Sequence, residues 1–386
     1  MSTSTGSVSF KPSQGHRELD RLRKAVWRLA RLVEILAVLV IVWLLAAPPP
    51  ILVTLGAPQT VSTVHPKVGV HTRLTDEPEE WKIQKTLQMV REMGAPWVVE
   101  YFPWDYIEHE KGQFDWSHAD TVVDHAQAQG LQVIARLGFV PKWARPQGTV
   151  TSYLDSDHYQ DFADFVAAFA EHFKGRVNDI IIWNEPNTNF EWGERPVDPA
   201  SYVQLLKAAY TAAKARVPGV KILGGALAPN LAPPNSTDTM NDLEYLDKMY
   251  AAGAKDYMDL LAVHAYGWQA PAEEPAAPER INFRRPELLH AIMARYGDGD
   301  KHVMITEGGW NDSPRWTKAV TPPQRIADTL HAYAWCEQTN WVDACAMWAF
   351  RFPAPSYSFN DYWTFVTPEF DVKPIYYEVQ KYTAGK

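Results

Sequence analysis

The sequence predicts a (β/α)8 TIM barrel, a closed sheet of eight parallel strands covered by helices. Short apolar runs alternate with amphipathic stretches, and this alternation repeats eight times over 68–386. Apolar strands separated by helices are typical of a parallel sheet, and eight such units close into a barrel. A doubly wound open sheet is the alternative, but the first strand–helix turn lacks a glycine-rich phosphate-binding fingerprint.

Each expected strand is a short apolar run, and the runs begin at Val68, Trp97, Leu131, Asp179, Val220, Met258, His302 and Asp343. The amphipathic stretches between and after them predict helices, among them 79–93, 117–129, 158–174, 199–216 and 374–382. In such a barrel the functional groups gather at the carboxyl ends of the strands. The residues that end these runs are therefore the first candidates for a site.

The chain ahead of the barrel divides into three parts. Residues 1–31 are basic, 32–57 are apolar with no charge between Ile35 and Ala57, and 58–67 read as a linker. Basic residues before an apolar run predict a cytoplasmic flank, a single-pass transmembrane anchor over 32–57, and a barrel on the extracytoplasmic side of the cell membrane. A cleaved signal peptide, which would give a secreted protein, is the alternative.

Composition excludes several classes of protein. The chain carries a net charge of -9 although residues 1–57 hold seven basic and three acidic residues, so its body is acidic and nucleic acid is not an expected partner. Its two cysteines, Cys336 and Cys345, cannot form a disulfide framework and are expected as buried thiols. No CxxC, HExxH or clustered His/Cys pattern is present, so we expect neither a metal nor a cofactor.

Two of the apolar runs end in a glutamate. DIIIWNEP places Glu185 after the fourth strand, and ITEGGW places Glu307 after the seventh. A buried strand has no use for a charge unless something at its end needs one, although a salt bridge to a loop would explain either glutamate alone. Two carboxyl groups about 5 Å apart at the mouth of a barrel are the geometry of a retaining glycosidase.

With these motifs the chain resembles the clan of retaining glycoside hydrolases built on eightfold barrels. The resemblance rests on WNEP (Trp183 to Pro186), TEGG (Thr306 to Gly309) and HAY (His264 to Tyr266), and it covers the whole barrel. With the segment WDYIEHEKGQFDWS the chain is most similar to glycoside hydrolase family 39, which includes β-xylosidases, α-iduronidases and exopolysaccharide-degrading enzymes.

The resemblance implies a role for each residue of these motifs. Glu185 would be the general acid/base, protonated at rest, and Glu307 the nucleophile that forms a glycosyl-enzyme. Asn184 would bind the sugar 2-hydroxyl, and Tyr266 would donate a hydrogen bond to the nucleophile. His264 would lie close by in the same mouth, unless it is an ordinary core histidine.

Aromatic residues near the strand ends are candidate walls for sugar rings. Trp348 would form the floor under the sugar at the cleavage point, and Trp310 would flank it. Further candidates on the loops after strands four, six and eight are Trp192, Trp268, Tyr357 and Trp363. Hydrophobic packing of the loops on themselves is the alternative for each.

The chain departs from the clan on strand two. Many relatives carry an arginine there, whereas WVVEYFPW has Glu100 at a position that could point inward. An unpaired buried charge is costly, so we expect Glu100 to pair with Arg73 or Arg136.

These observations predict a retaining glycoside hydrolase that acts on an extracellular or cell-surface polysaccharide or oligosaccharide. A non-catalytic carbohydrate-binding barrel in a polysaccharide export or assembly system is one alternative, and a transglycosylase is the other. Binding alone needs no paired acid and nucleophile, which favours the enzyme.

Overall fold

The computed structural model describes residues 14–46 and 53–386, which fall into two compact units, Met1–Leu52 and Val53–Lys386. The first unit is described through one helix, α1 (Gln14–Ala46). Among the described residues, no helix is both long and apolar enough to cross a membrane. The anchor predicted over 32–57 is therefore not supported by them. Residues 1–13 of the predicted cytoplasmic segment and 47–52 of the predicted anchor lie outside the described residues.

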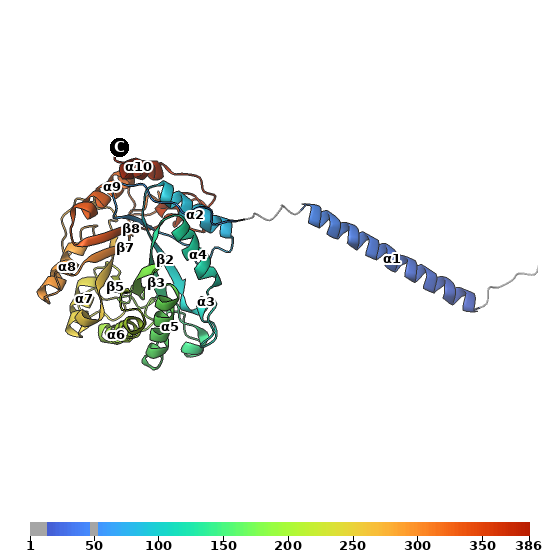
Figure 1. Cartoon of the computed structure of the whole chain (residues 1–386), viewed down its shortest axis with the longest axis horizontal. Coiled ribbons are helices and arrows are strands. Elements are labelled where there is room, and N and C mark those ends of the chain that lie inside the picture. The colour runs from blue at the N-terminus through green and yellow to red at the C-terminus, as the bar shows by residue number, and fades with distance from the viewer. Residues whose placement is uncertain (1–13, 47–52) are drawn as a thin grey trace, which may run out of the picture. The chain divides into compact units, whose positions relative to one another are not determined.

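The second unit is a closed barrel of eight parallel strands in which each strand pairs with its neighbours in sequence and β8 pairs with β1 (Figure 1). The strands are β1 (Val68–His71), β2 (Trp97–Pro103), β3 (Gln132–Gly138), β4 (Val177–Ile182), β5 (Lys221–Leu227), β6 (Leu260–Tyr266), β7 (Val303–Gly309) and β8 (Val342–Met347). The predicted barrel is confirmed, and every strand lies in or beside its predicted apolar run.

Helices lie outside the strands (Figure 1). They are α2 (Glu80–Glu92), α3 (Trp104–Ile107), α4 (Ser117–Ala128), α5 (Tyr159–His172), α6 (Pro199–Arg216), α7 (Asp242–Ala251), α8 (Pro286–Arg295), α9 (Pro322–Gln338) and α10 (Pro374–Thr383). Short 3-10 helices span Lys142–Ala144, Ser156–His158, Ala254–Tyr257 and Asp361–Trp363. The start of α6 matches its prediction because Asp198 accepts hydrogen bonds from the first turn and Pro199 follows it at N1.

The strands are predominantly apolar because both faces of the sheet are buried. On β4, Ile181 belongs to a cluster inside the barrel, whereas Ile180 and Ile182 belong to the larger cluster beneath the helices. Successive side chains of a strand point to opposite faces, so the same alternation decides which polar side chains enter the barrel.

The chain before β1 runs against the barrel. The Gln59 amide donates to the Ala128 carbonyl at 2.8 Å, and the Val64 amide donates to the Thr383 carbonyl at 2.9 Å. Cys336 and Cys345 are both buried and free, as the sequence predicts.

Candidate active site

The backbone after β4 turns Glu185 towards the barrel mouth. Trp183 and Glu185 both have positive φ angles, 74° and 41°, in the left-handed region that L-residues seldom adopt. The Glu185 amide donates to the Ala226 carbonyl of β5 at 3.0 Å, which holds this turn against the next strand. Such backbone strain persists only where the surroundings enforce it, and it is concentrated at functional sites.

Glu307 enters the barrel through a β-bulge in β7. Val263 pairs with Ile305, but the next residue, His264, pairs with Glu307, so Thr306 is the extra residue. Because Met304 faces the interior, simple alternation would turn Glu307 outward. The bulge re-aims Glu307 to the interior side beside His264, which is a known use of bulges next to active sites.

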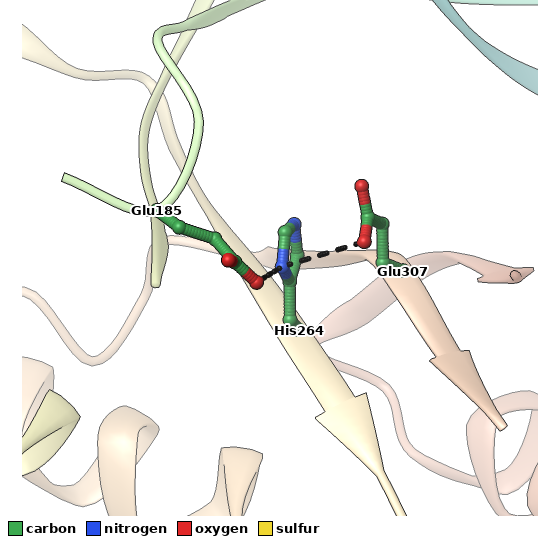
Figure 2. A group of neighbouring side chains, drawn as sticks. All are labelled: Glu185, His264 and Glu307. Carbon is green, nitrogen blue, oxygen red and sulfur yellow. Dashed lines mark hydrogen bonds and ion pairs between the residues drawn. The ribbon is translucent and has the colours of Figure 1, made fainter. Parts of the chain in front are cut away.

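His264 lies between the two glutamates (Figure 2). Its Nδ1 is 2.8 Å from Glu185 Oε1 and 3.8 Å from Glu307 Oε2. One carboxylate oxygen of each glutamate and one ring nitrogen of His264 all lie within 4.8 Å of one another. The side chains of His264 and Glu307 are 1% and 8% exposed, whereas that of Glu185 is 17% exposed. The structure therefore brings the two predicted carboxylates together at one buried point.

Both oxygens of the Glu307 carboxylate accept hydrogen bonds. Arg136 Nη1 donates to Oε1 at 2.6 Å, and the Tyr266 hydroxyl donates to Oε2 at 2.7 Å. Burial by itself raises the pKa of Glu307, but the positive charges of His264 and Arg136 outweigh it and hold this pKa at about 2. Glu307 is therefore an anion near neutral pH.

Arg136 joins Glu307 to the residue beside the other glutamate. Its Nη1 also donates to Asn184 Oδ1 at 2.8 Å, and its guanidinium lies 4.7 Å from the centre of the Tyr101 ring. Arg136 thereby orients the Asn184 amide group, whose side chain also forms a hydrogen bond with the Glu191 carboxyl group.

The pKa values of the two histidines of the site are shifted in opposite directions. Burial lowers the pKa of His264, but Glu307 and Glu185 beside it outweigh this and raise the pKa above its ordinary value. Burial and the nearby Arg136 lower the pKa of His71 to about 3, so this ring is neutral. His71 Nδ1 lies 2.6 Å from the Thr72 carbonyl, which makes Nδ1 the donor and leaves Nε2 as an acceptor 3.7 Å from Glu307 Oε1.

A cleft of about 330 Å³ opens beside this cluster. Its lining includes Tyr101, Arg136 and Asn184 together with the aromatic rings of Phe139 and Phe190. Glu191 also lines it; burial raises the pKa of this carboxyl group to about 7, against the lowering effect of Arg136. The cleft therefore carries an acidic group that titrates near neutral pH.

Of the predicted tryptophans, Trp363 and Trp348 lie beside the two glutamates, and the Trp363 ring packs edge-on against Tyr266 with centroids 5.2 Å apart. Trp348 follows β8. Its amide donates to the Gly308 carbonyl at 2.9 Å, and its ring packs edge-on against His71 with centroids 4.6 Å apart. Trp268 is partly buried, with Lys318 Nζ 3.3 Å from the ring centre. Neither Trp192 nor Trp310 can act as a predicted sugar wall, because each is 1% exposed and packs within the loops.

The predicted ion pair of Glu100 is wrong. Val99 faces the barrel interior, so alternation turns Glu100 to the opposite side of β2, where it is 1% exposed. Its carboxylate accepts hydrogen bonds from the backbone amides of Leu74 and Thr75 and from the hydroxyl groups of Thr72 and Thr75. These four donors satisfy the buried charge in place of an arginine.

Sequence reasoning missed three residues of the site: Arg136, His71 and Glu191. For Arg136 and His71 the signal was available, since each is a polar residue in an apolar strand, as Glu185 is at the end of one. Glu191 lies on a loop, and its sequence neighbourhood contains no comparable signal.

Comparison with known proteins gives a partial family match. The model of the family described as β-galactosidase, glycoside hydrolase family 42, matches residues 76–161, which is the segment from the end of β1 to the start of α5. This segment contains Arg136 but neither catalytic candidate.

The fold is shared with solved glycoside hydrolases. A family 39 glycoside hydrolase from Bacteroides cellulosilyticus WH2 matches with a TM-score of 0.67 at 18% identity, covering 85% of this chain and 65% of that one. A monomeric β-xylosidase from Caulobacter crescentus CB15 matches with a TM-score of 0.60 at 18% identity, covering 83% and 69%. The family 39 enzyme from Xanthomonas axonopodis pv. citri matches with a TM-score of 0.60 at 16% identity, covering 84% and 67%.

These identities are low enough that the matches establish the fold alone, and the chain spans 65% of the length of the Bacteroides protein. Together with the family match they confirm that the chain resembles the barrel glycoside hydrolases, the family 39 enzymes among them.

Proposed function

We propose that the protein is a retaining glycoside hydrolase that cleaves a polysaccharide or oligosaccharide by double displacement. The observation that carries this proposal is the separation of the two carboxylates, which have one oxygen each within 4.8 Å of the other. Carboxyl groups about 5–5.5 Å apart are typical of retaining enzymes, whereas inverting enzymes need about 6.5–9.5 Å to admit a water molecule.

The proposed reaction has two steps. In the first, a Glu307 oxygen attacks the anomeric carbon, the bond from that carbon to the leaving oxygen breaks, and Glu185 gives a proton to the leaving oxygen. In the second, Glu185 takes a proton from a water molecule, whose oxygen attacks the anomeric carbon and releases Glu307 as a carboxylate. Each step inverts the anomeric centre, so the product retains the configuration of the substrate.

The surroundings of the two glutamates support this division of roles. Glu307 has a pKa of about 2 and two orienting donors, as a nucleophile requires. Glu185 is the more exposed carboxylate, and its Oε1 lies 2.8 Å from His264 Nδ1, which positions the side chain at the mouth. The protonated resting state of Glu185 itself stays a prediction.

The cleft supports a carbohydrate ligand. Tyr101, Phe139 and Phe190 supply aromatic rings along it, and flat apolar rings pack well against the faces of pyranoses. Asn184 lines the cleft directly before Glu185 in the chain, and its Nδ2 carries two hydrogens, so it can donate to a hydroxyl next to the anomeric carbon as well as to Glu191. The similar structures include β-xylosidases, and xylosides and galactosides belong in the first substrates tried.

The test is a screen of neutral polysaccharides and aryl glycosides with products read by mass spectrometry and proton NMR. We expect wild type to release products of retained configuration. Glu307→Gln should abolish cleavage of every substrate, and Glu185→Gln should slow substrates with poor leaving groups far more than activated ones. Glu110→Gln, a change in an exposed glutamate, is the control. Products of inverted configuration would refute the mechanism, and polymer binding without any cleavage would favour a carbohydrate-binding barrel.

We also propose that the amino-terminal segment holds the barrel at the extracytoplasmic face of a membrane. What supports this is the order of basic residues up to Arg31 followed by an apolar stretch without charge from Ile35 to Ala57. Cell fractionation with protease added from outside tests it, using the full chain and a version that starts at Val61. The full chain should pellet with membranes and be cleaved from outside; recovery of both versions in the same soluble fraction would refute it.

A further inference from the structure

A second cluster of metal-binding side chains lies outside the catalytic site. Glu273, Asp328 and His331 each offer one donor atom, and these atoms lie within 4.8 Å of one another. Asp328 and His331 are three residues apart on α9, so they project from the same face of that helix. Glu273 belongs to the loop that links β6 to α8.

The loop and the helix are already joined at this point. The amide of Ala272, the residue before Glu273, donates to Asp328 Oδ1 at 3.1 Å. Ala272 and Asp328 are 2% and 3% exposed, so this contact fixes the loop backbone against α9. Packing therefore holds Asp328 and the loop backbone next to Glu273 in place.

One polar atom of the cluster lacks a partner. Asp328 Oδ2 is buried, and no residue that the structure describes donates a hydrogen bond to it. A buried oxygen that carries part of a negative charge is costly to leave without a donor or cation. A bound cation would satisfy it.

The charges of the cluster do not balance. Glu273 pairs with His331, whereas no lysine or arginine within residues 53–386 forms an ion pair with Glu273 or Asp328. Two carboxylates and one imidazole therefore leave an excess of negative charge even when the imidazole is protonated. The side chains of Glu273 and His331 are 58% and 55% exposed, which leaves room for an ion and its water ligands to enter from solvent.

We propose that Glu273, Asp328 and His331 form a binding site for a divalent transition-metal ion of the Zn²⁺ type, which joins the loop after β6 to α9. Imidazole nitrogen and carboxylate oxygen are both zinc ligands, and with three protein ligands water can complete the shell. Calcium and magnesium prefer oxygen ligands alone, so the histidine makes them weaker competitors.

Metal binding would order the loop after β6 next to the barrel mouth. The loop begins directly after Tyr266, which donates to Glu307, and the Trp310 indole donates to the Ala270 carbonyl at 2.9 Å within it. Metal binding at Glu273 would hold a segment that is only a few residues from both contacts. It takes no part in the chemistry of the two glutamates.

The test uses the tag-free full chain, stripped with a chelator and titrated with Zn²⁺. We expect about one Zn²⁺ per chain that raises the melting temperature and slows amide hydrogen exchange over 267–285. Glu273→Gln and His331→Gln should each weaken binding at least about tenfold and remove the protection of the loop. Glu274→Gln changes the neighbouring carboxylate, which pairs with Arg280, and should leave both measurements unchanged.

Two further arms identify the ion and the place where it binds. Ca²⁺ and Mg²⁺ at the same concentration should give no protection. Zn²⁺ bound by the Glu185–His264–Glu307 group would survive in Glu273→Gln and be lost in Glu307→Gln. The proposal is overturned if wild type binds no Zn²⁺ at tens of micromolar, or if Glu273→Gln and His331→Gln bind it as wild type does.

Discussion

Asp179, the first residue of the DIIIWNEP run, makes the folded barrel less stable as pH rises. It follows the same alternation on β4 as Ile181 and therefore faces the barrel interior, where it is 6% exposed and its Oδ1 has no hydrogen-bond partner among the described residues. Burial raises the pKa of Asp179 to about 6 from its ordinary value of 3.8; Lys221 opposes this, and Asp343 adds to it.

The sign and size of the effect follow from these two pKa values. Below pH 3.8 the group is protonated in both states and costs nothing. Between pH 3.8 and about 6 the unfolded chain releases the proton while the folded chain keeps it, so the free energy of unfolding falls as pH rises. Above about pH 6 the loss is complete and amounts to roughly 3 kcal/mol at about 1.4 kcal/mol per pKa unit.

We therefore expect Asp179→Asn to change how stability depends on pH. The free energy of unfolding of the variant minus that of wild type should be up to about 3 kcal/mol larger at pH 8 than at pH 4. This corresponds to a rise of about 3–6 °C in the difference between their melting temperatures. Urea unfolding followed by tryptophan fluorescence at both pH values measures this difference, with the exposed Asp300→Asn as control. A difference between variant and wild type that is equal at pH 4 and pH 8 would refute the reasoning, whatever its size.

Three further predictions concern the catalytic mouth. Tyr266→Phe removes a hydrogen bond to an ionised group and should lower kcat about 10- to 100-fold with the fold intact, as measured by kinetics and circular dichroism. Arg136→Met removes a charge that lowers the pKa of Glu307, so the acidic limb of the profile of kcat/KM against pH should move to higher pH; an unmoved limb would contradict this. Burial holds the pKa of Glu191 at about 7, so wild-type activity should change with ionisation of this group near pH 7, and Glu191→Gln should remove that inflection from the profile.

The fold was predictable because its signals are local and repeated. The apolar runs mark the strands, and the pair Asp198 and Pro199 marks the start of α6 at the residue where the structure begins it. The barrel needs both faces of each strand to be apolar, and that requirement is visible in DIIIW without knowledge of any neighbour.

The candidate site was predictable only as far as chain position determines it. Glu185 and Glu307 stand at strand ends, but the bulge at Thr306 that turns Glu307 inward is a property of the pairing with β6. The burial of Trp192 and Trp310 likewise depends on loop packing that their spacing does not encode. The composition of a loop does not tell whether an aromatic side chain near the mouth contacts a sugar or is buried in the core.

The alternation of β2 and β3 explains how the site obtains its arginine. The sequence departs from the resemblance on strand two, where Glu100 stands in place of an arginine. In the barrel Tyr101 pairs with Arg136, and both face the interior, so the cation enters one strand later at the same level. Glu100 is next to Tyr101 on β2 and therefore points to the opposite face of the sheet. There it accepts hydrogen bonds from the loop after β1 and stabilises that loop outside the site. A shift of one residue in the register of β2 would turn Glu100 into the barrel and Tyr101 out of it. A further carboxylate near Glu307 would then raise its pKa and oppose its proposed role as the nucleophile.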